Sequence, residues 1–451
     1  MATVAAPQPA TADWPNPSRA WFAVGVLTLG YTVSFIDRTI LSLLIEPIKA
    51  DLHLSDTQIA LLQGLAFGLF YTAMGLPLGW LVDRVSRKRV IAAGVTTWCL
   101  ATAACGLSAN FWQIFLARVG VGAGEAALSP AAISMIGDNF PAEKRAFPIS
   151  VYSMASSVGA GLALMVGGAI IQAISAQPRF ALPLVGDVAP WQAVFVIVGM
   201  AGLVVVALLT LVAEPARREV AVARSGGNGF VAHLRRHRAF HLLHLGGMAL
   251  YCVLIYGVLS WMPAYFIRTF GWSAGEVGLR YGFVVLVCGG AGLAGAGWLS
   301  AHLSARGVRA ASLKVTGVSI LLVTPLMIAA CLAPDGWTAL AILAPAMIPF
   351  TASGGLAVAA LCDPAPGDLR GRTAALYYFV LGVVGLTVGP VSVALITEHL
   401  FGDPRALGPA IAVAAAILGP LAGLGVLLAI KPYERAMAAL AAMTSNDRIE
   451  P

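Results

Sequence analysis

Charged residues are scarce in this sequence. Only 11% of the 451 residues are Asp, Glu, Lys or Arg, whereas 59% are hydrophobic. A typical soluble domain carries about 25% charged residues, so this composition excludes a water-soluble enzyme of this length. The high hydrophobicity also excludes an intrinsically disordered chain, and the lack of a short-period repeat excludes a fibrous one.

The sequence also lacks the motifs of common catalytic and cofactor sites. Its 6 cysteines lie in apolar stretches and form no Cys-x-x-Cys pair, which argues against both a disulfide framework and a zinc site. It contains no Gly-x-x-x-x-Gly-Lys loop to bind nucleotide phosphates, so ATP-driven pumping has no support. We therefore expect a protein that is not an enzyme and that uses no metal and no cofactor.

What the sequence does contain is a series of long apolar stretches. Each is long enough to cross a bilayer, which takes about 20 residues. Backbone polar groups find no water in hydrocarbon, so the stretches should be helices. We count twelve, at roughly 20–45, 57–81, 90–109, 111–136, 147–174, 190–213, 241–266, 277–303, 312–333, 337–361, 373–398 and 408–431.

A polar stretch from Glu214 to Phe240 divides the twelve stretches into six and six. The predicted fold is therefore an all-α membrane protein with two six-helix bundles. It has five regions: a disordered tail at 1–18, an N-terminal bundle at 19–213, a linker at 214–240, a C-terminal bundle at 241–432 and a tail at 433–451.

Lysine and arginine are distributed unevenly between the two sides of the predicted membrane. With a cytoplasmic N-terminus, 21 of the 28 fall in inner segments and four in outer segments. This bias predicts a multi-pass protein of the cell (inner) membrane with both termini and the linker cytoplasmic. It also accounts for the net charge of +7 without a nucleic-acid partner.

Two short patterns recur in both halves of the chain. The triplet Gly79-Trp80-Leu81 returns 218 residues later as Gly297-Trp298-Leu299. In each half, an Asp and an Arg seven residues apart flank the loop after the fourth helix of that half: Asp138 and Arg145, then Asp363 and Arg370. Two repeated halves are typical of transporters that bind substrate between the halves, near the middle of the bilayer.

The motifs resemble those of the major facilitator superfamily, over about Trp21 to Arg435. The fourth helix carries an Arg-x-x-x-Gly-x-Gly pattern at Arg118, Gly122 and Gly124. The signature of the loop between the second and third helices, Gly-x-x-x-Asp-Arg-x-x-Arg-Lys, is present as Gly79, Asp83, Arg84, Arg87 and Lys88. The resemblance implies two pseudo-symmetric bundles that alternate access to a central substrate site.

The same resemblance implies a conformational latch on the cytoplasmic side, closed in the outward-open state. The alternative is that the basic run 87–89 serves only as a membrane anchor. The second copy of the motif has Ala301 in the place of Asp83, so a symmetric latch in the C-half is in doubt. The latch residues are Gly79, Asp83, Arg84, Arg87, Asp138 and Arg145.

Finer features resemble the Spinster family of sphingolipid and lysolipid transporters. The first helix contains Ser34-Phe35-Ile36-Asp37-Arg38, and the fourth contains Gly122-Ala123-Gly124-Glu125-Ala126. Asp-Arg in the first helix and Glu in the fourth also occur in symporters of sugar acids and aromatic acids. The first resemblance implies a lipid-like substrate such as a lysolipid or sphingoid phosphate, and the second implies a small organic anion.

Charge inside the bilayer is the feature that bears most directly on function. A charge at a helix centre costs roughly 2.5 to 3.5 kcal/mol on insertion scales. Only Asp37 and Glu125, among the acidic residues, lie well inside a span; Arg38 is within reach of Glu125, and Arg118 lies at the depth of Asp37. These four residues are either a structural ion-pair cluster or a site for proton coupling and for the substrate head, where breaking a pair lets Glu125 take up a proton.

Aromatic and small polar residues of the central helices are candidates for the substrate cavity. We name Ser34, Tyr256, Tyr377 and Tyr378, and we expect His241 and His244 at the cytoplasmic surface. The sequence thus predicts a monomeric secondary active transporter with an amphipathic substrate and a proton as partners. The alternatives are a proton-coupled symporter of small organic anions and a non-transporting membrane receptor on the same scaffold.

Overall fold

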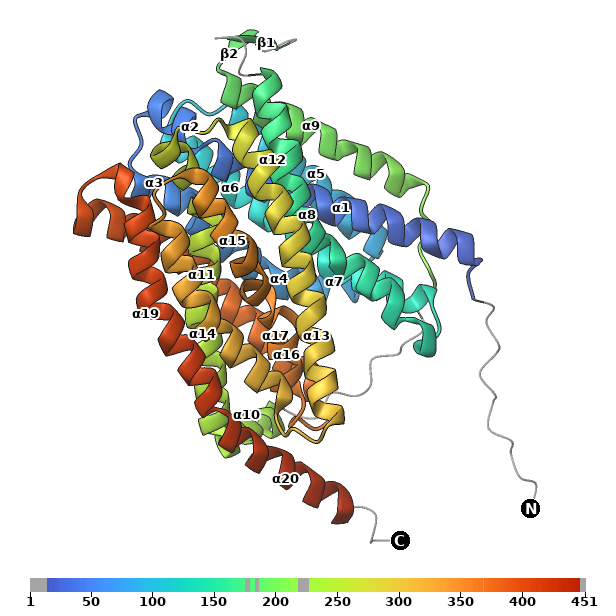
Figure 1. The fold of residues 1–451 in the computed structure, drawn as a ribbon. Coiled ribbons are helices and arrows are strands. Elements are labelled where there is room, and N and C mark those ends of the chain that lie inside the picture. Colours follow the sequence, from blue (N-terminus) through green and yellow to red (C-terminus); the bar gives the residue numbers. More distant parts are fainter. Residues whose placement is uncertain (1–13, 175–178, 183–185, 218–226, 368, 447–451) are drawn as a thin grey trace.

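The computed structural model describes residues 14–174, 179–182, 186–217, 227–367 and 369–446 (Figure 1). Most of the expected 1–18 tail, the linker residues 218–226 and the last five residues lie outside the described residues. The described part of the linker contains a helix, and the region after 433 continues as a helix to Asn446.

Nearly all of the described chain is helical. The N-half contains α1 (Pro17–Leu43), α2 (Ile45–Leu52), α3 (Asp56–Leu61), η1 (Leu62–Leu69), α4 (Phe70–Val82), α5 (Arg87–Gly106), α6 (Phe111–Glu125), α7 (Leu128–Asn139), η2 (Ala142–Lys144), α8 (Ala146–Ile174), β1 (Phe180–Leu182), β2 (Gly186–Val188) and α9 (Pro190–Thr210). The two short strands pair antiparallel as one hairpin.

The C-half begins with a short helix of the linker. Its elements are α10 (Gly227–Arg236), α11 (Arg238–Phe270), α12 (Ala274–Val284), η3 (Val285–Gly289), α13 (Gly290–Ala305), α14 (Ala311–Cys331), α15 (Gly336–Thr351), α16 (Ser353–Cys362), α17 (Arg370–Leu381), η4 (Gly382–Leu386), α18 (Thr387–Leu395), η5 (Ile396–Phe401), η6 (Pro404–Ala406), α19 (Leu407–Leu428) and α20 (Ile430–Asn446). Here η1, η3, η4 and η5 are π-helical, and η2 and η6 are 3₁₀ helices.

Twelve helical segments of the described chain are long and apolar enough to cross a membrane, which confirms the predicted fold. Several spans consist of consecutive elements: the second is α3, η1 and α4, and the fourth is α6 and α7. Polar caps begin five of the even-numbered spans, because the first N–H groups of a helix need acceptors. These caps are Ser55, Asn110, Ser273, Asp335 and Asp403.

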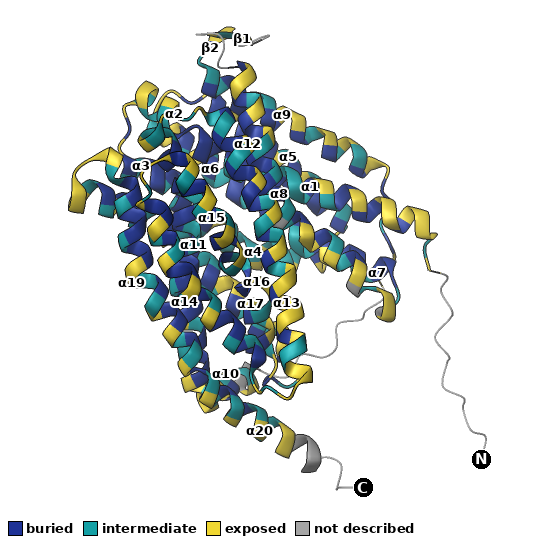
Figure 2. Ribbon diagram, viewed as in Figure 1, coloured by how far each residue is buried: buried dark blue, intermediate teal, exposed yellow. Residues whose placement is uncertain are grey.

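The two halves meet at one end of the molecule and separate at the other (Figure 1). The main contacts between them join α8 with α12 and η3, α3 and η1 with α18, η1 with η4, and α1 with α11. The continuation of the second span, α4, has no comparable contact with a described C-half element. We call the end with α2, α3 and the β hairpin the closed end, and the end with α10 and α20 the open end. Figure 2 shows buried residues where helices face one another and exposed residues along the outer faces of helices such as α9 and α13.

Ion pairs hold the halves together at the closed end. Arg268, near the end of α11, donates hydrogen bonds to Glu46 at 2.6 Å and to Asp56 at 2.7 and 2.8 Å. Lys49 also pairs with Asp56, which is 1% exposed. The backbone N–H of Thr57 donates to Glu398 of η5 at 3.0 Å. Arg268 and Glu398 of the C-half therefore both bond to the N-half segment that contains α2 and the start of α3.

Glycines allow the helices to approach closely between the halves. A Cβ atom built on Gly278 of α12 would lie 2.4 Å from the Leu164 carbonyl oxygen of α8, and one on Gly161 of α8 would lie 2.6 Å from the Cβ of Leu286. Small residues of this kind let helices in a membrane pack backbone against backbone. The fifth and eighth spans therefore form a tight seam at the closed end.

The internal repeat extends to hydrogen-bond geometry. Arg145 donates from its Nε to the carbonyl of Phe140 at 2.9 Å. Arg370 donates in the same way to the carbonyl of Ala365 at 3.3 Å. Both acceptors lie five residues before the arginine, so the two halves build the loop after their fourth span in the same manner.

The glycine seam gives a prediction about stability. Gly278→Ala should lower the free energy of unfolding by about 1–3 kcal/mol, because an added methyl group meets the α8 backbone and overpacks the seam. Gly295→Ala is the matched control, since a Cβ there has no neighbour within 4 Å. Thermal unfolding of the purified protein in detergent measures both. Equal melting temperatures for the two variants would contradict the tight seam.

Candidate functional site

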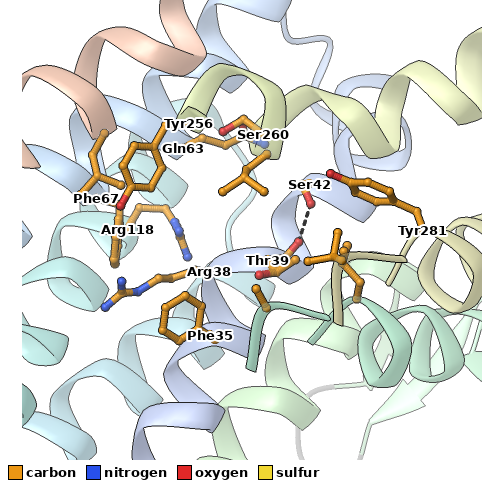
Figure 3. Close-up of a pocket in the computed structure, with 15 residues that line it drawn as sticks. Phe35, Arg38, Thr39, Ser42, Gln63, Phe67, Arg118, Tyr256, Ser260 and Tyr281 are labelled. Atoms are coloured by element: carbon orange, nitrogen blue, oxygen red, sulfur yellow. Dashed lines mark hydrogen bonds between the residues drawn. The ribbon is translucent and has the colours of Figure 1, made fainter. Parts of the chain in front are cut away.

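A pocket lies between the two halves (Figure 3). It contains about 790 Å³ of space not filled by protein atoms, part of it continuous with solvent. Its walls come from the N-half elements α1, η1, α6 and α8 and the C-half elements α11, α12, η3 and η4. The lining residues are Phe35, Arg38, Thr39, Ser42, Gln63, Phe67, Arg118, Ala160, Leu164, Tyr256, Leu259, Ser260, Tyr281, Val285 and Leu386.

Two ion pairs lie at this pocket, and they are the ones that the sequence predicts. Arg38 of α1 donates from its Nε to Glu125 Oε2 at 2.6 Å, and the Glu125 side chain is 0% exposed. Arg118 of α6 is 3.5 Å from Asp37 Oδ1, and both residues are buried. The Asp37 carboxylate also accepts a hydrogen bond from Thr102 of α5. Each buried acid thus has one cation, and the four charges sum to zero.

The end of α6 and its glycines place the acid of the first pair. The α6 helix ends at Glu125, and the backbone N–H of Ala126 still bonds to the Gly122 carbonyl at 3.3 Å. A Cβ on Gly122 would lie 2.5 Å from the Phe67 carbonyl, and one on Gly124 would lie 2.7 Å from the Trp98 backbone nitrogen. The Gly-x-Gly part of the motif therefore lets the fourth span pack tightly between η1 and α5, which brings Glu125 to Arg38 beside the pocket.

Aromatic rings surround the Arg38 guanidinium. Its Cζ lies 5.2, 4.9 and 4.5 Å from the ring centroids of Phe35, Phe67 and Tyr71. The Arg118 guanidinium lies 5.2 Å from the same Phe67 ring, on the same side of the pocket (Figure 3). Ring faces attract cations, so these rings stabilise positive charge where water is largely excluded.

Both ion pairs leave a polar atom without a protein partner. Oε1 of Glu125 and Nε of Arg118 are buried and have no hydrogen-bond partner among the described residues. The 3.5 Å distance from Arg118 to Asp37 is also at the long limit for a hydrogen bond. Glu125 therefore has an oxygen available to bind a proton, and Arg118 has a donor available for an anion.

Three π-helical segments contribute to the pocket. Gln63 and Phe67 belong to η1, Val285 to η3 and Leu386 to η4. Such segments are rare and occur frequently at functional sites. Hydropathy reveals the spans that hold these segments but not the local change in backbone, so the sequence does not indicate that these residues line a pocket.

Of the four expected cavity residues, only Tyr256 lines this pocket. The other three do not line it in this structure. Ser34 donates its hydroxyl to the Tyr31 carbonyl at 2.9 Å within α1. Tyr377 is buried with its ring 6.4 Å from His244, and Tyr378 is 61% exposed outside the pocket lining.

The expected surface position of two histidines is also wrong. His241 and His244 are 4% and 0% exposed. The His244 ring packs against Phe240 and Tyr377, and its Nε2 lies 2.9 Å from the Ala357 carbonyl. The first turns of α11 are therefore covered by protein on the side that holds both histidines.

The residues of the expected latch lie within the N-half in this structure. Arg87 pairs with Asp138, and Arg84 lies over the Trp80 ring at 3.5 Å. Asp83 is exposed, and a Cβ on Gly79 would meet nothing within 4 Å. At the open end, the motif thus has no described C-half group against Gly79, and its latch role stays a prediction.

Glu214 ties the end of the N-half to this motif. It accepts hydrogen bonds from the Ser86 hydroxyl and, at 2.7 Å, from the Arg87 backbone N–H. Partial burial acts to raise the pKa of Glu214, but these hydrogen bonds and the Arg87 charge outweigh it and lower the pKa below its usual range. Glu214 is therefore a stable anionic partner for the loop after the second span.

Comparison with known proteins agrees with this architecture. Residues 27–390 match the model of the Major Facilitator Superfamily. The MFS-type efflux pump of Mycolicibacterium smegmatis is 31% identical over 431 residues, which covers 94% of this chain and 96% of that protein. A crystal structure of a bacterial homolog to the human lysosomal transporter Spinster, in an inward-facing and occupied conformation, has a TM-score of 0.76 and 29% identity, with 93% of this chain and 97% of that chain covered.

Two further relatives match over a part of their length. The sphingosine-1-phosphate transporter SPNS2 of Xenopus tropicalis is 30% identical over 172 residues, 38% of this chain and 33% of that protein. A probable L-galactonate transporter of Escherichia coli is 30% identical over 181 residues, 40% of this chain and 36% of that protein. These likenesses confirm the resemblance to Spinster proteins. The chain belongs to the Major Facilitator Superfamily and is a multi-pass membrane transporter.

Proposed function

We propose that this transporter carries an anionic, lipid-like amphiphile of the lysolipid or sphingoid phosphate type by alternating access. The observation that carries the proposal is the division of the pocket. Arg38 and Arg118 lie on one side, and the walls from α8, α11 and η3 include the apolar side chains of Leu164, Leu259 and Val285. A cationic end would bind the head group, and an apolar wall would bury the chain. The similarity to a sphingosine-1-phosphate transporter supports this substrate class.

The same site supports coupling to protons. Protonation of Glu125 would remove its charge and break the attraction that holds Arg38. Arg38 would then be free to bind the anionic head, and loss of the proton would restore the 2.6 Å pair. A carboxylate that exchanges between a cation and a proton in this way links substrate binding to the proton gradient, and ionisable residues within a membrane are commonly functional.

The distribution of basic residues supports an orientation. The open end carries the basic motif around Arg87 and the helix α10, which ends in Arg235 and Arg236. Because positive residues favour the cytoplasmic side, we place the open end in the cytoplasm of a cell with this protein in its inner membrane. The structure would then represent the inward-facing state, with both termini cytoplasmic.

A second candidate is proton-coupled symport of a small organic anion. The unpartnered Nε of Arg118 favours it, since a free guanidinium donor suits a carboxylate. The partial similarity to a probable L-galactonate transporter supports it as well. The two candidate substrates differ in their use of the apolar wall. A lipid would bury its chain against it, whereas a sugar acid has no chain to bury.

The first prediction of this proposal concerns Glu125. Glu125→Gln mimics the protonated acid, so gradient-driven accumulation in liposomes should fall to the level seen without a gradient. Substrate affinity and melting temperature should stay near those of the wild type. Glu276→Gln is the control, because the Glu276 side chain is partly exposed, does not line the pocket, and bonds to Arg280 and Ser273 at the start of its own helix. If flux and melting temperature fall together, the Arg38–Glu125 pair is structural; if driven flux persists, Glu125 carries no coupled proton.

The second prediction separates the two substrate classes. Leu259→Gln replaces part of the apolar wall by an amide, so the affinity for a lysolipid should fall by roughly tenfold, the worth of one buried aliphatic side chain. Binding of a small carboxylate should change little. Leu279→Gln is the control, since Leu279 is 59% exposed and does not line the pocket. Binding of the carboxylate alone by the wild type would favour the second candidate.

The third prediction concerns the latch. Asp83→Asn should leave this open-end arrangement intact, because Asp83 is exposed here. It should weaken the opposite state, in which the latch closes, and shift the population toward the present one. Cysteines at open-end cavity positions should then react faster with a thiol reagent. Asp187→Asn, at an exposed residue of β2, serves as the control, and equal labelling rates in the two variants would refute the latch.

A further inference from the structure

Two polar side chains of the pocket take no part in the ion pairs and have buried atoms without a protein partner. They are Gln63 of η1, through both Oε1 and Nε2, and Tyr281 of α12, through its hydroxyl. Neither group has a hydrogen-bond partner among the described residues, and Tyr281 is 0% exposed. Buried polar groups in folded proteins are nearly always hydrogen-bonded, so unpaired atoms that face a cavity require an explanation.

Tyr281 lies apart from the cationic end of the pocket, whereas Gln63 lies four residues before Phe67, whose ring contacts Arg118. Figure 3 shows the Tyr281 hydroxyl directed into the pocket, on the side opposite Arg118. Packing holds both positions. The Tyr281 ring lies 6.1 Å from the Phe266 ring, and Gly64, next to Gln63, lies so close to η4 that an added Cβ would be 3.0 Å from the Leu386 carbonyl. Gln63 is thus held next to a contact that joins the halves, and the Tyr281 ring is held by packing within the C-half.

We propose that Gln63 and Tyr281 form a neutral polar subsite, which hydrogen-bonds an uncharged hydroxyl or amide group of the substrate. The Gln63 amide offers one acceptor and two donors, and the Tyr281 hydroxyl offers both roles, so a neutral group that donates and accepts is complementary to either. The inference rests on the proposed function and narrows it. The substrate is an anionic amphiphile with a neutral polar group in addition to its head, and simple alkyl phosphates and fatty acids lack that group.

The subsite would also couple the ligand to both halves. Gln63 belongs to the N-half and Tyr281 to the C-half. A substrate that hydrogen-bonds to both side chains would join helices of the two halves, which separate when the closed end opens. A site built to hydrogen-bond a ligand group discriminates strongly against a ligand without it, because its own polar atoms then stay unpaired.

A matched pair of lipids tests the subsite on the purified full-length protein. The probes are oleoyl lysophosphatidate and its deoxy analogue, which lacks the free glycerol hydroxyl. The wild type should bind the hydroxylated probe about tenfold more tightly, the worth of one net hydrogen bond. Gln63→Leu and Tyr281→Phe should each bring this ratio closer to one and leave the affinity for the deoxy probe unchanged.

Thr316→Val is the matched control. Thr316 of α14 also has a buried hydroxyl without a partner among the described residues, but it does not line the pocket. This variant should keep the wild-type ratio. A ratio that stays at the wild-type value in both Gln63→Leu and Tyr281→Phe would overturn the subsite. Equal binding of the two probes by the wild type would also overturn the subsite, but it would leave the proposed lipid transport standing. If the wild type binds neither probe, the proposed function fails and the subsite with it.

Discussion

Buried charges in a membrane protein must be neutralised locally, and this constraint organises the N-half of the molecule. Asp37, Arg38, Arg118 and Glu125 form two ion pairs where water is largely excluded. Leaving one of these charges alone would cost far more than either pair gains. The first and fourth spans must therefore stay close at this level, and the glycines of α6 permit that approach. A proton is one of the few species that can replace a cation at such a carboxylate. The ion pair that constrains the first and fourth spans is therefore also the best candidate for proton coupling.

The elements of the fold and the charged part of the site were predictable from the sequence for physical reasons. Apolar length reports directly on the crossing of a bilayer, so the twelve spans were evident. Depth along a helix follows from counting residues, so Asp37 and Glu125 could be placed well inside the bilayer and Arg118 at the depth of Asp37. The pairing of Arg38 with Glu125 rested on the reach of the arginine and on the family resemblance, which implies that the first and fourth helices face the central cavity.

The faces of the helices were not predictable in the same way. Tyr377 and Tyr256 are both tyrosines in central spans of the C-half, yet Tyr377 packs against His244 and only Tyr256 lines the pocket. In an apolar helix, lipid-facing and protein-facing positions have similar residues, so periodicity carries little signal. The π-helical segments shift the register of side chains further. Gln63 was visible as a polar residue within an apolar span, but its unpaired state depends on neighbours distant in the sequence.

The closed end shows how a transporter can hold one state without becoming locked in it. The contacts there are ion pairs around Arg268 and a glycine seam between α8 and α12, whereas the pocket below takes residues from both halves. A ligand shifts a conformational equilibrium only by its difference in affinity for the two states. Under the proposed function, head-group contacts to Arg38 and Arg118 would lie within the N-half alone and would move with it as one body. Contacts to both Gln63 and Tyr281 would change when the halves move, so the neutral and apolar parts of the substrate, more than its charge, would determine how strongly binding favours one state.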